Sequence, residues 1–300
     1  MKVRFATTGR IILLGLITNF FGSHLYGQGL VNLNEKFKSD VGFVEHLFKI
    51  EEHAEASIVL HQYLDLYKDA GKRDTLRFFL GKSYYHQRQL SPSIKFFDQV
   101  RASSDLFLES RFLSLYQKAF AGDYEDSRKG WLEMQSGKSL EGAVVNFELA
   151  GIALLQRDMD SYDQYSRDFS SRYYQLSTSQ ENLEKFANGI RNFKTKSPLL
   201  AGLYSAIIPG SGKMYYGKIG EGLISLLTQT IFGLQTLEAY RKDGVRSARF
   251  IIFGSAFSVF YVANIWGSVI GVKIRNDEFN DQINESVLVT MHVPLRLLFD

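Results

Sequence analysis

The residues of this chain that could carry chemistry are few, and none stands at the spacing that a known reaction requires. Three histidines, His46, His53 and His61, lie seven and eight positions apart. A metalloprotease helix needs two histidines four positions apart, and no H-E-x-x-H motif occurs in the chain. There is no G-x-S-x-G motif, and the lack of cysteine excludes thiol catalysis and disulfides. We therefore expect no catalytic, cofactor-binding or metal-binding site and no enzyme, although an enzyme of unnamed chemistry stays open as an alternative.

A glycine-rich loop with a lysine is the strongest apparent exception. The segment Pro-Gly-Ser-Gly-Lys at residues 209–213 looks like the end of a phosphate-binding loop. However, Ile207 stands where a Walker A loop needs its first glycine, and Met214 stands where it needs Ser or Thr. Gly217 and Gly220 follow no expected buried strand, so the pattern does not favour a dinucleotide-binding fingerprint either. We expect a structural turn at a membrane interface.

Composition narrows the class of protein further. The chain has 300 residues, of which 22% are charged and 14% are aromatic, so it can bury a sizeable core and is not wholly disordered. Its formal net charge of +3 at pH 7 is small for a protein of this length whose main partner is a polyanion. We therefore expect no nucleic-acid partner.

Residues 1–29 have the composition of a secretory signal peptide. Three basic residues among the first ten precede an apolar run over residues 11–21, and Gly27 and Gly29 follow at the spacing of a cleavage site. The apolar run is too short to cross a bilayer comfortably; a retained signal anchor is the alternative. The mature chain is expected to begin near Gln28 or Leu30.

Residues 30–196 are predicted to form a helical domain. The only proline between residues 34 and 196 is Pro92, and apolar residues recur at helical rather than strand spacing. Glycine, serine and aspartate clusters divide this region into helices of about 12 to 18 residues. The fold class is therefore all-α. The expected breaks lie near residues 71–74, 90–92, 103–105, 122–123, 136–138 and 157–158.

Packing residues recur in this region at an interval of about 34 positions. Phe97 lies 34 positions after Tyr63 and 34 positions before Trp131. Residues 34–195 resemble a tetratricopeptide-like array, in which a small residue lets two helices approach and an aromatic residue fills the groove between them. The resemblance implies stacked helix pairs with a concave surface for a peptide or helix; a non-repeating helical bundle is the alternative. The expected repeat-packing residues are Leu80, Gly81, Tyr84, Phe97 and Trp131.

Two apolar segments near the C-terminus are predicted to cross a membrane as a helical hairpin. Residues 250–272 carry no formal charge over 23 positions, which is about 35 Å of helix, and residues 219–240 form a less apolar first span. Small and polar residues are expected to pack the two helices together, or to pair Gly267 and Gly271 with a second copy. The expected packing residues are Ser225, Thr228 and Gln235 on the first span and Gly254, Ser258, Asn264, Gly267 and Gly271 on the second.

The loop before the first span resembles the signature of a bacterial family of small two-span membrane domains. The match covers about residues 198–275, within a predicted membrane domain of residues 197–275. The resemblance implies membrane residence and a hairpin, but no reaction. The residues that carry the match, expected to form a turn at the membrane interface, are Pro209, Gly210, Gly212, Tyr215, Tyr216, Gly217 and Gly222.

The charges between the spans predict an orientation. The loop of residues 241–249 carries four basic residues and one acidic residue, which by the positive-inside rule places it in the cytoplasm. The helical domain and the polar tail of residues 276–300 then lie on the periplasmic side of a bacterial inner membrane. We expect a membrane-anchored scaffold that binds protein partners in the cell envelope, in envelope assembly or secretion; assembly as a homo-oligomer stays open. The alternative is a small transport or lipid-contact module regulated by the helical repeats.

Overall fold

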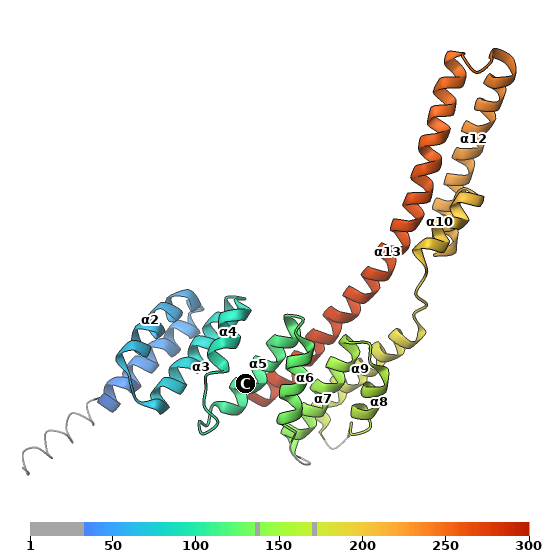
Figure 1. The fold of residues 1–300 in the computed structure, drawn as a ribbon. Coiled ribbons are helices and arrows are strands. Elements are labelled where there is room, and N and C mark those ends of the chain that lie inside the picture. The colour runs from blue at the N-terminus through green and yellow to red at the C-terminus, as the bar shows by residue number, and fades with distance from the viewer. Residues whose placement is uncertain (1–32, 136–138, 170–172, 300) are drawn as a thin grey trace, which may run out of the picture. The chain divides into compact units, whose positions relative to one another are not determined.

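The computed structural model describes residues 33–135, 139–169 and 173–299, and every element in these ranges is an α-helix (Figure 1). The predicted all-α class is therefore confirmed. The predicted signal peptide of residues 1–29 lies outside the described residues. The chain divides into two compact units, one that ends at Gln135 and also includes Phe299, and one that spans Ser136–Leu298.

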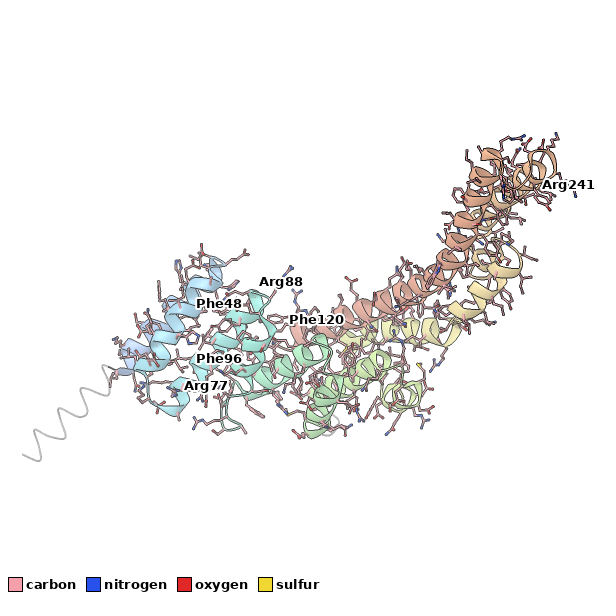
Figure 2. The ribbon with its side chains drawn as sticks, turned by 45° about the horizontal axis from the view of Figure 1, so that its top comes forward. Phe48, Arg77, Arg88, Phe96, Phe120 and Arg241 are labelled. Atoms are coloured by element: carbon pink, nitrogen blue, oxygen red, sulfur yellow. The ribbon has the colours of Figure 1, made fainter. Side chains whose placement is uncertain are left out.

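The first unit contains a helix of residues 33–49 followed by five helices that pack against one another in chain order. Its core is apolar, with aromatic rings packed against it. Phe96, labelled in Figure 2, stacks on Tyr84 with ring centroids 5.7 Å apart, and Phe48 meets the edge of Phe79. The five helices are α2 (His53–Leu66), α3 (Ala70–His86), α4 (Leu90–Phe97), α5 (Phe107–Phe120) and α6 (Tyr124–Glu133).

One hydrogen bond of this unit recurs 34 residues along the chain. The Ser93 hydroxyl of α4 donates to the carbonyl oxygen of Gly81 in α3 at 2.7 Å. The Ser127 hydroxyl of α6 donates to the carbonyl oxygen of Leu115 in α5, also at 2.7 Å. Both bonds are buried and span 12 residues. Two successive helix pairs are therefore fastened by the same contact.

The expected repeat-packing residues lie in and around these helix pairs. Leu80, Phe97 and Trp131 are fully buried, and Tyr84 is half-buried. A Cβ atom on Gly81 would lie 2.6 Å from the ring of Phe97, so only glycine lets α3 and α4 approach this closely.

The start of α3 differs from the expected break at residues 71–74. The helix begins at Ala70 because Asp69 caps it, with its carboxylate accepting a hydrogen bond from the backbone N–H of Lys72 at 3.0 Å. Gly71 therefore lies inside the first turn of the helix rather than in the turn before it.

The second unit joins three helices of the predicted helical domain to the C-terminal helices. Its α7 is buried on almost all sides, which fits its nearly continuous apolar sequence. The last helix, α13, runs without a break for 52 residues. The helices of this unit are α7 (Leu140–Leu155), α8 (Met159–Ser166), α9 (Tyr174–Asn192), α10 (Pro198–Ile207), α11 (Ser211–Tyr215), α12 (Ile219–Asp243) and α13 (Ala248–Phe299).

The final part of α13 completes the core around α7 and the end of α9. Met291 packs so closely on Gly151 of α7 that a Cβ atom there would lie 2.6 Å from its side chain. Arg157 donates hydrogen bonds to the side-chain oxygens of Asn280 and Asn284 at 2.9 and 3.0 Å. Phe193 stacks on Phe279. The predicted tail of residues 276–300 is thus helical where it is described, and it packs on the predicted helical domain.

One carboxyl group is buried in this core without a hydrogen-bond partner. Glu148 of α7 is 0% exposed, and neither of its carboxylate oxygens is hydrogen-bonded within the described part of the chain. Burial raises the pKa of Glu148 well above its ordinary value of 4.5. The folded protein therefore holds this proton to a higher pH than the unfolded chain does.

This burial predicts a stability that falls with rising pH. Above pH 4.5 the unfolded chain releases the Glu148 proton that the folded chain still holds. The contribution of Glu148 to the free energy of unfolding therefore falls with rising pH until the pH exceeds its raised pKa. Glu148→Gln cannot ionise and should flatten this decline, as measured by thermal unfolding of the full-length protein between pH 4.5 and pH 8. Glu141→Gln on the same helix is the control, because the pKa of Glu141 is lowered, mainly by a hydrogen bond from Ser139. An unchanged decline in Glu148→Gln would contradict the assignment.

Candidate functional site

The glycine-rich loop forms a tight connection between α10, α11 and α12. Ser197 caps α10 by accepting a hydrogen bond from the backbone N–H of Leu200, and Pro198 occupies the first turn. After α10 ends, Gly210 has a φ of +85° and Gly217 a φ of +100°. These left-handed conformations are costly for residues with a Cβ atom. The two glycines therefore set where the chain turns into and out of α11.

Two other glycines of the loop allow backbones to touch. A Cβ atom on Gly212 would overlap the carbonyl oxygen of Ala201 in α10. A Cβ atom on Gly222 would lie 2.6 Å from the carbonyl oxygen of Gly210 and from the side chain of Met214. The glycine spacing of the predicted interfacial turn thus follows from two close backbone contacts and two left-handed turns. Pro209 lies between Ile208 and Gly210 in this turn, half-buried.

A chain of hydrogen bonds fastens this turn to α13. The backbone N–H of Gly212 donates to the Ser205 hydroxyl at 3.1 Å, and the hydroxyls of Ser205 and Ser268 are 2.7 Å apart. Ser268 donates to the carbonyl oxygen of Asn264 at 2.9 Å. Because each hydroxyl has one proton, Ser205 donates to Ser268. Tyr261 adds a parallel link by donating to the carbonyl oxygen of Ala206 at 2.6 Å.

The two tyrosines of the turn have different contacts. The Tyr215 hydroxyl accepts a hydrogen bond from the backbone N–H of Ser197 at 3.3 Å, and the Lys196 ammonium lies 4.6 Å from its ring centroid. Tyr216 packs on Gly271 of α13, where a Cβ atom would overlap the phenol. Gly271, predicted to pack two membrane helices, thus makes room for an aromatic ring of the turn.

Side-chain contacts join α12 to α13. Phe232 stacks on Phe260 with ring centroids 5.1 Å apart. A Cβ atom on Gly254 would meet the Thr236 methyl group at 3.5 Å. Ser258 is exposed, and its hydroxyl donates within α13 to the carbonyl oxygen of Gly254. Among the expected packing residues, Gly254 therefore faces α12 and Ser258 does not.

A cavity of about 210 Å³ lies among α11, α12 and α13. Ser225, Thr228 and Asn264, which the sequence pattern had singled out, line it, whereas Gln235 does not. Lys213 and Gln229 also line it, and sequence reasoning had not assigned them to one site. Gln229 follows Ser225 by four positions, so a strongly polar residue at helical spacing within an apolar segment was the available signal.

Lys213 connects this cavity to a larger hollow. A depression of about 630 Å³ is lined by Lys213, Tyr216 and Lys218 of the turn and by Gly267, Gly271 and Arg275 of α13, among others. Lys218 pairs with Glu221 at 3.2 Å, and the Arg275 guanidinium lies over the ring of Phe193 at 4.7 Å. Lys213 donates to the Ser225 hydroxyl at 3.0 Å and has no ion pair with a carboxylate of the described chain.

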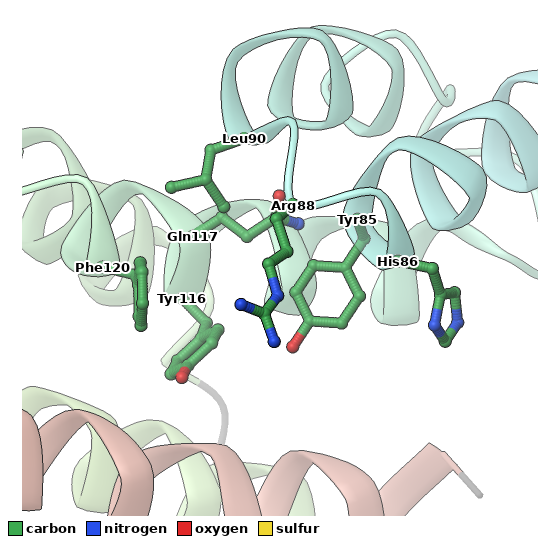
Figure 3. Close-up of a pocket in the computed structure, with 7 residues that line it drawn as sticks. All are labelled: Tyr85, His86, Arg88, Leu90, Tyr116, Gln117 and Phe120. Carbon is green, nitrogen blue, oxygen red and sulfur yellow. The ribbon is translucent and has the colours of Figure 1, made fainter. Parts of the chain in front are cut away.

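The first unit has a separate pocket of about 390 Å³ between α3 and α5 (Figure 3). Tyr85, Arg88, Tyr116 and Phe120 are among the side chains that line it. Arg88 has a φ of +59°, which is rare for a residue with a Cβ atom. Phe120 is 52% exposed. The pocket combines aromatic surface with a cation, as sites for peptide segments often do.

No group of three or more histidine, cysteine, aspartate or glutamate side chains is placed to hold a metal ion among the described residues. His53 stacks on His86 with ring centroids 4.2 Å apart, and His61 lies 2.9 Å from the Tyr84 hydroxyl. His53 and His61 thus make an aromatic contact and a hydrogen bond, respectively.

Comparison with known proteins shows no family for this chain. No family model matches it, and no solved structure matches it. An uncharacterized protein of Methanocaldococcus jannaschii is 57% identical over 35 residues, which are 12% of this chain and 35% of that protein. The chain thus matches about a third of the length of this curated relative. A match of this length does not assign a function to the chain.

The backbone contact at Gly212 predicts that alanine destabilises the protein more at Gly212 than at Gly220. Gly212→Ala should lower the unfolding midpoint of the full-length protein by about 4 °C or more, because the carbonyl of Ala201 cannot move aside without shifting α10. Gly220→Ala is the matched control. It has no atom within 4 Å of the added Cβ and lies in α12, so it should leave the midpoint unchanged or slightly raised. Equal effects of the two substitutions would contradict the described contact.

Proposed function

We propose that this protein is a helical scaffold anchored in a membrane through α13. The observation that carries the proposal is the continuity of α13. Within the described residues it is the one helix long and apolar enough to cross a bilayer, with a mean hydropathy of 1.6 over its most apolar window. The same helix continues into the segment in which Val287, Met291 and Leu295 are buried. One uninterrupted element therefore carries both the apolar span and part of the core of the second unit.

In this proposal α12 is the first helix of a transmembrane hairpin, and α13 is the second. It has 25 residues, enough to cross the hydrocarbon core, although it is less apolar than α13. Its apolar side chains face outward: Ile224, Leu227 and Leu234 are 61% to 67% exposed. Such a row of exposed apolar side chains suits contact with lipid. The ring contacts between α12 and α13 support pairing of the two helices.

The scaffold part of the proposal rests on the helix pairs of the first unit. The recurring serine hydrogen bond and the buried Phe97 and Trp131 support a tetratricopeptide-like array, and the pocket with Arg88 and Phe120 offers a place for a partner segment. The partner is a protein of the cell envelope or a second copy of this chain. The basic loop of residues 241–249 supports placing the array on the periplasmic side of a bacterial inner membrane.

A second candidate function is a lipid-contact or transport module formed by α11, α12 and α13. The cavity around Lys213 favours it, because a cation and two buried amides in an apolar helix pair are costly unless they bind something. In this case the helical array would regulate the module.

Cysteine labelling tests the membrane placement. The chain has no native cysteine, so Ser103→Cys, Val245→Cys and Asp281→Cys each give one exposed thiol. A membrane-impermeant maleimide, added to cells with a permeabilised outer membrane, should label the variants at Ser103 and Asp281 but label that at Val245 only after lysis. Labelling of all three before lysis would contradict the hairpin, and the reverse pattern would contradict the orientation.

Photo-crosslinking tests the scaffold. A photoreactive phenylalanine analogue in place of Phe120, in the pocket of the first unit, should give a discrete adduct with one envelope protein or with a tagged second copy. Lys129, whose side chain is 69% exposed on α6, is the control position and should give no such adduct. Adducts of equal yield at both positions, or at neither, would contradict a binding role for the pocket.

A further inference from the structure

The cavity among α11, α12 and α13 is lined by two amide side chains without hydrogen-bond partners. Gln229 is 3% exposed and Asn264 is 6% exposed. Within the described chain, neither the oxygen nor the nitrogen of either amide is hydrogen-bonded. Both side chains line the same cavity. Buried polar groups are normally satisfied, so two unpartnered amides at one cavity point to a ligand.

A cation stands at the same cavity. The Lys213 ammonium donates to the Ser225 hydroxyl at 3.0 Å but has no carboxylate partner among the described residues. A lysine held among apolar helices is stable when an anion accompanies it. The cavity therefore offers a positive charge for one oxyanion and two amide groups that can donate to its oxygens.

The surroundings favour a lipid as the source of the anion. Ile224 and Phe260 line the cavity, and Ile270 and Ile274 line the larger hollow, which Lys213 also lines. Ile224 and Ile270 are 67% and 50% exposed. Apolar side chains beside a polar cavity suit a molecule that has acyl chains and an anionic head.

We propose that this cavity binds the phosphate group of a membrane phospholipid. Lys213 neutralises the phosphate charge, and the amides of Gln229 and Asn264 donate hydrogen bonds to its oxygens. The inference rests on the proposed placement of α12 and α13 in a bilayer. It deepens the second candidate function by naming the ligand.

The test uses the purified full-length protein, delipidated in a maltoside detergent that contains no phosphate. Its unfolding midpoint is measured while dihexanoyl phosphatidylglycerol, dihexanoylglycerol or inorganic phosphate is added. The phospholipid should raise the midpoint by about 5 °C at a hundredfold excess over its Kd. Dihexanoylglycerol, which lacks the phosphate, should not. An equal rise with inorganic phosphate would assign the site to a free anion and overturn the lipid proposal.

Three variants locate the response. Lys213→Gln should weaken the response to phospholipid by about tenfold or more in apparent Kd, because it removes a charge-assisted hydrogen bond, and Asn264→Leu should weaken it as well. Lys242→Gln removes a cation at the far end of α12, where it pairs with Glu238, and should leave the response intact. Equal responses in wild type and Lys213→Gln would overturn the proposal. If Asn264→Leu lowers the midpoint but keeps the lipid response, the amides serve only helix packing and their part of the proposal fails.

Alkaline carbonate extraction of membranes separates this inference from the proposed function. A protein that stays in the membrane but shows no phospholipid response would overturn the lipid site and leave the membrane anchor standing. A protein that carbonate removes would overturn the anchor itself, and with it the placement on which the lipid site depends.

Discussion

The contact between the backbones of α10 and α11 is the constraint on which the C-terminal helices depend. Gly212 lies against the carbonyl of Ala201, and its N–H starts the hydrogen-bond chain through Ser205 and Ser268. This contact places Lys213 beside α12 and Tyr216 against Gly271 of α13. A short helix of five residues has little stability of its own. Helix α11 keeps its position because α10 and α12 both pack against it.

The second constraint is α13, because the two halves of this one helix are packed differently. Its first half is exposed and apolar, and its second half is packed through Val287, Met291 and Leu295. Helices α7 to α9 consequently form a compact unit with the C-terminal helices rather than with the helices before residue 136. The predicted domain boundary at residue 196 concerns where the membrane domain of the chain begins, and it stays a prediction.

Local sequence patterns predicted the helices, but they could not predict contacts between residues far apart in the sequence. The all-α class followed from helical spacing. The packing role of Phe97 followed from a 34-residue interval, and that of Gly81 from the resemblance of its surroundings to a tetratricopeptide repeat. The start of α3 was misplaced because a cap at Asp69 outweighs a glycine at position 71. The packing of Met291 on Gly151 joins residues 140 positions apart, and no periodicity reports such a pairing. For the same reason, Lys213, Gln229 and Asn264 could not be assigned to one cavity before the fold was known.

The position of Met291 in α13 determines when the core of the second unit can close during synthesis. Domains generally fold as their residues leave the ribosome, the N-terminal parts first. Helix α7, however, lacks the side chains that cover Gly151 until Met291 has been translated, which is after the apolar part of α13. The core of the second unit is therefore closed only after the apolar segment of α13 has been synthesised. Until then, the surface of α7 around Gly151 lacks the side chain of Met291 that covers it in the folded protein.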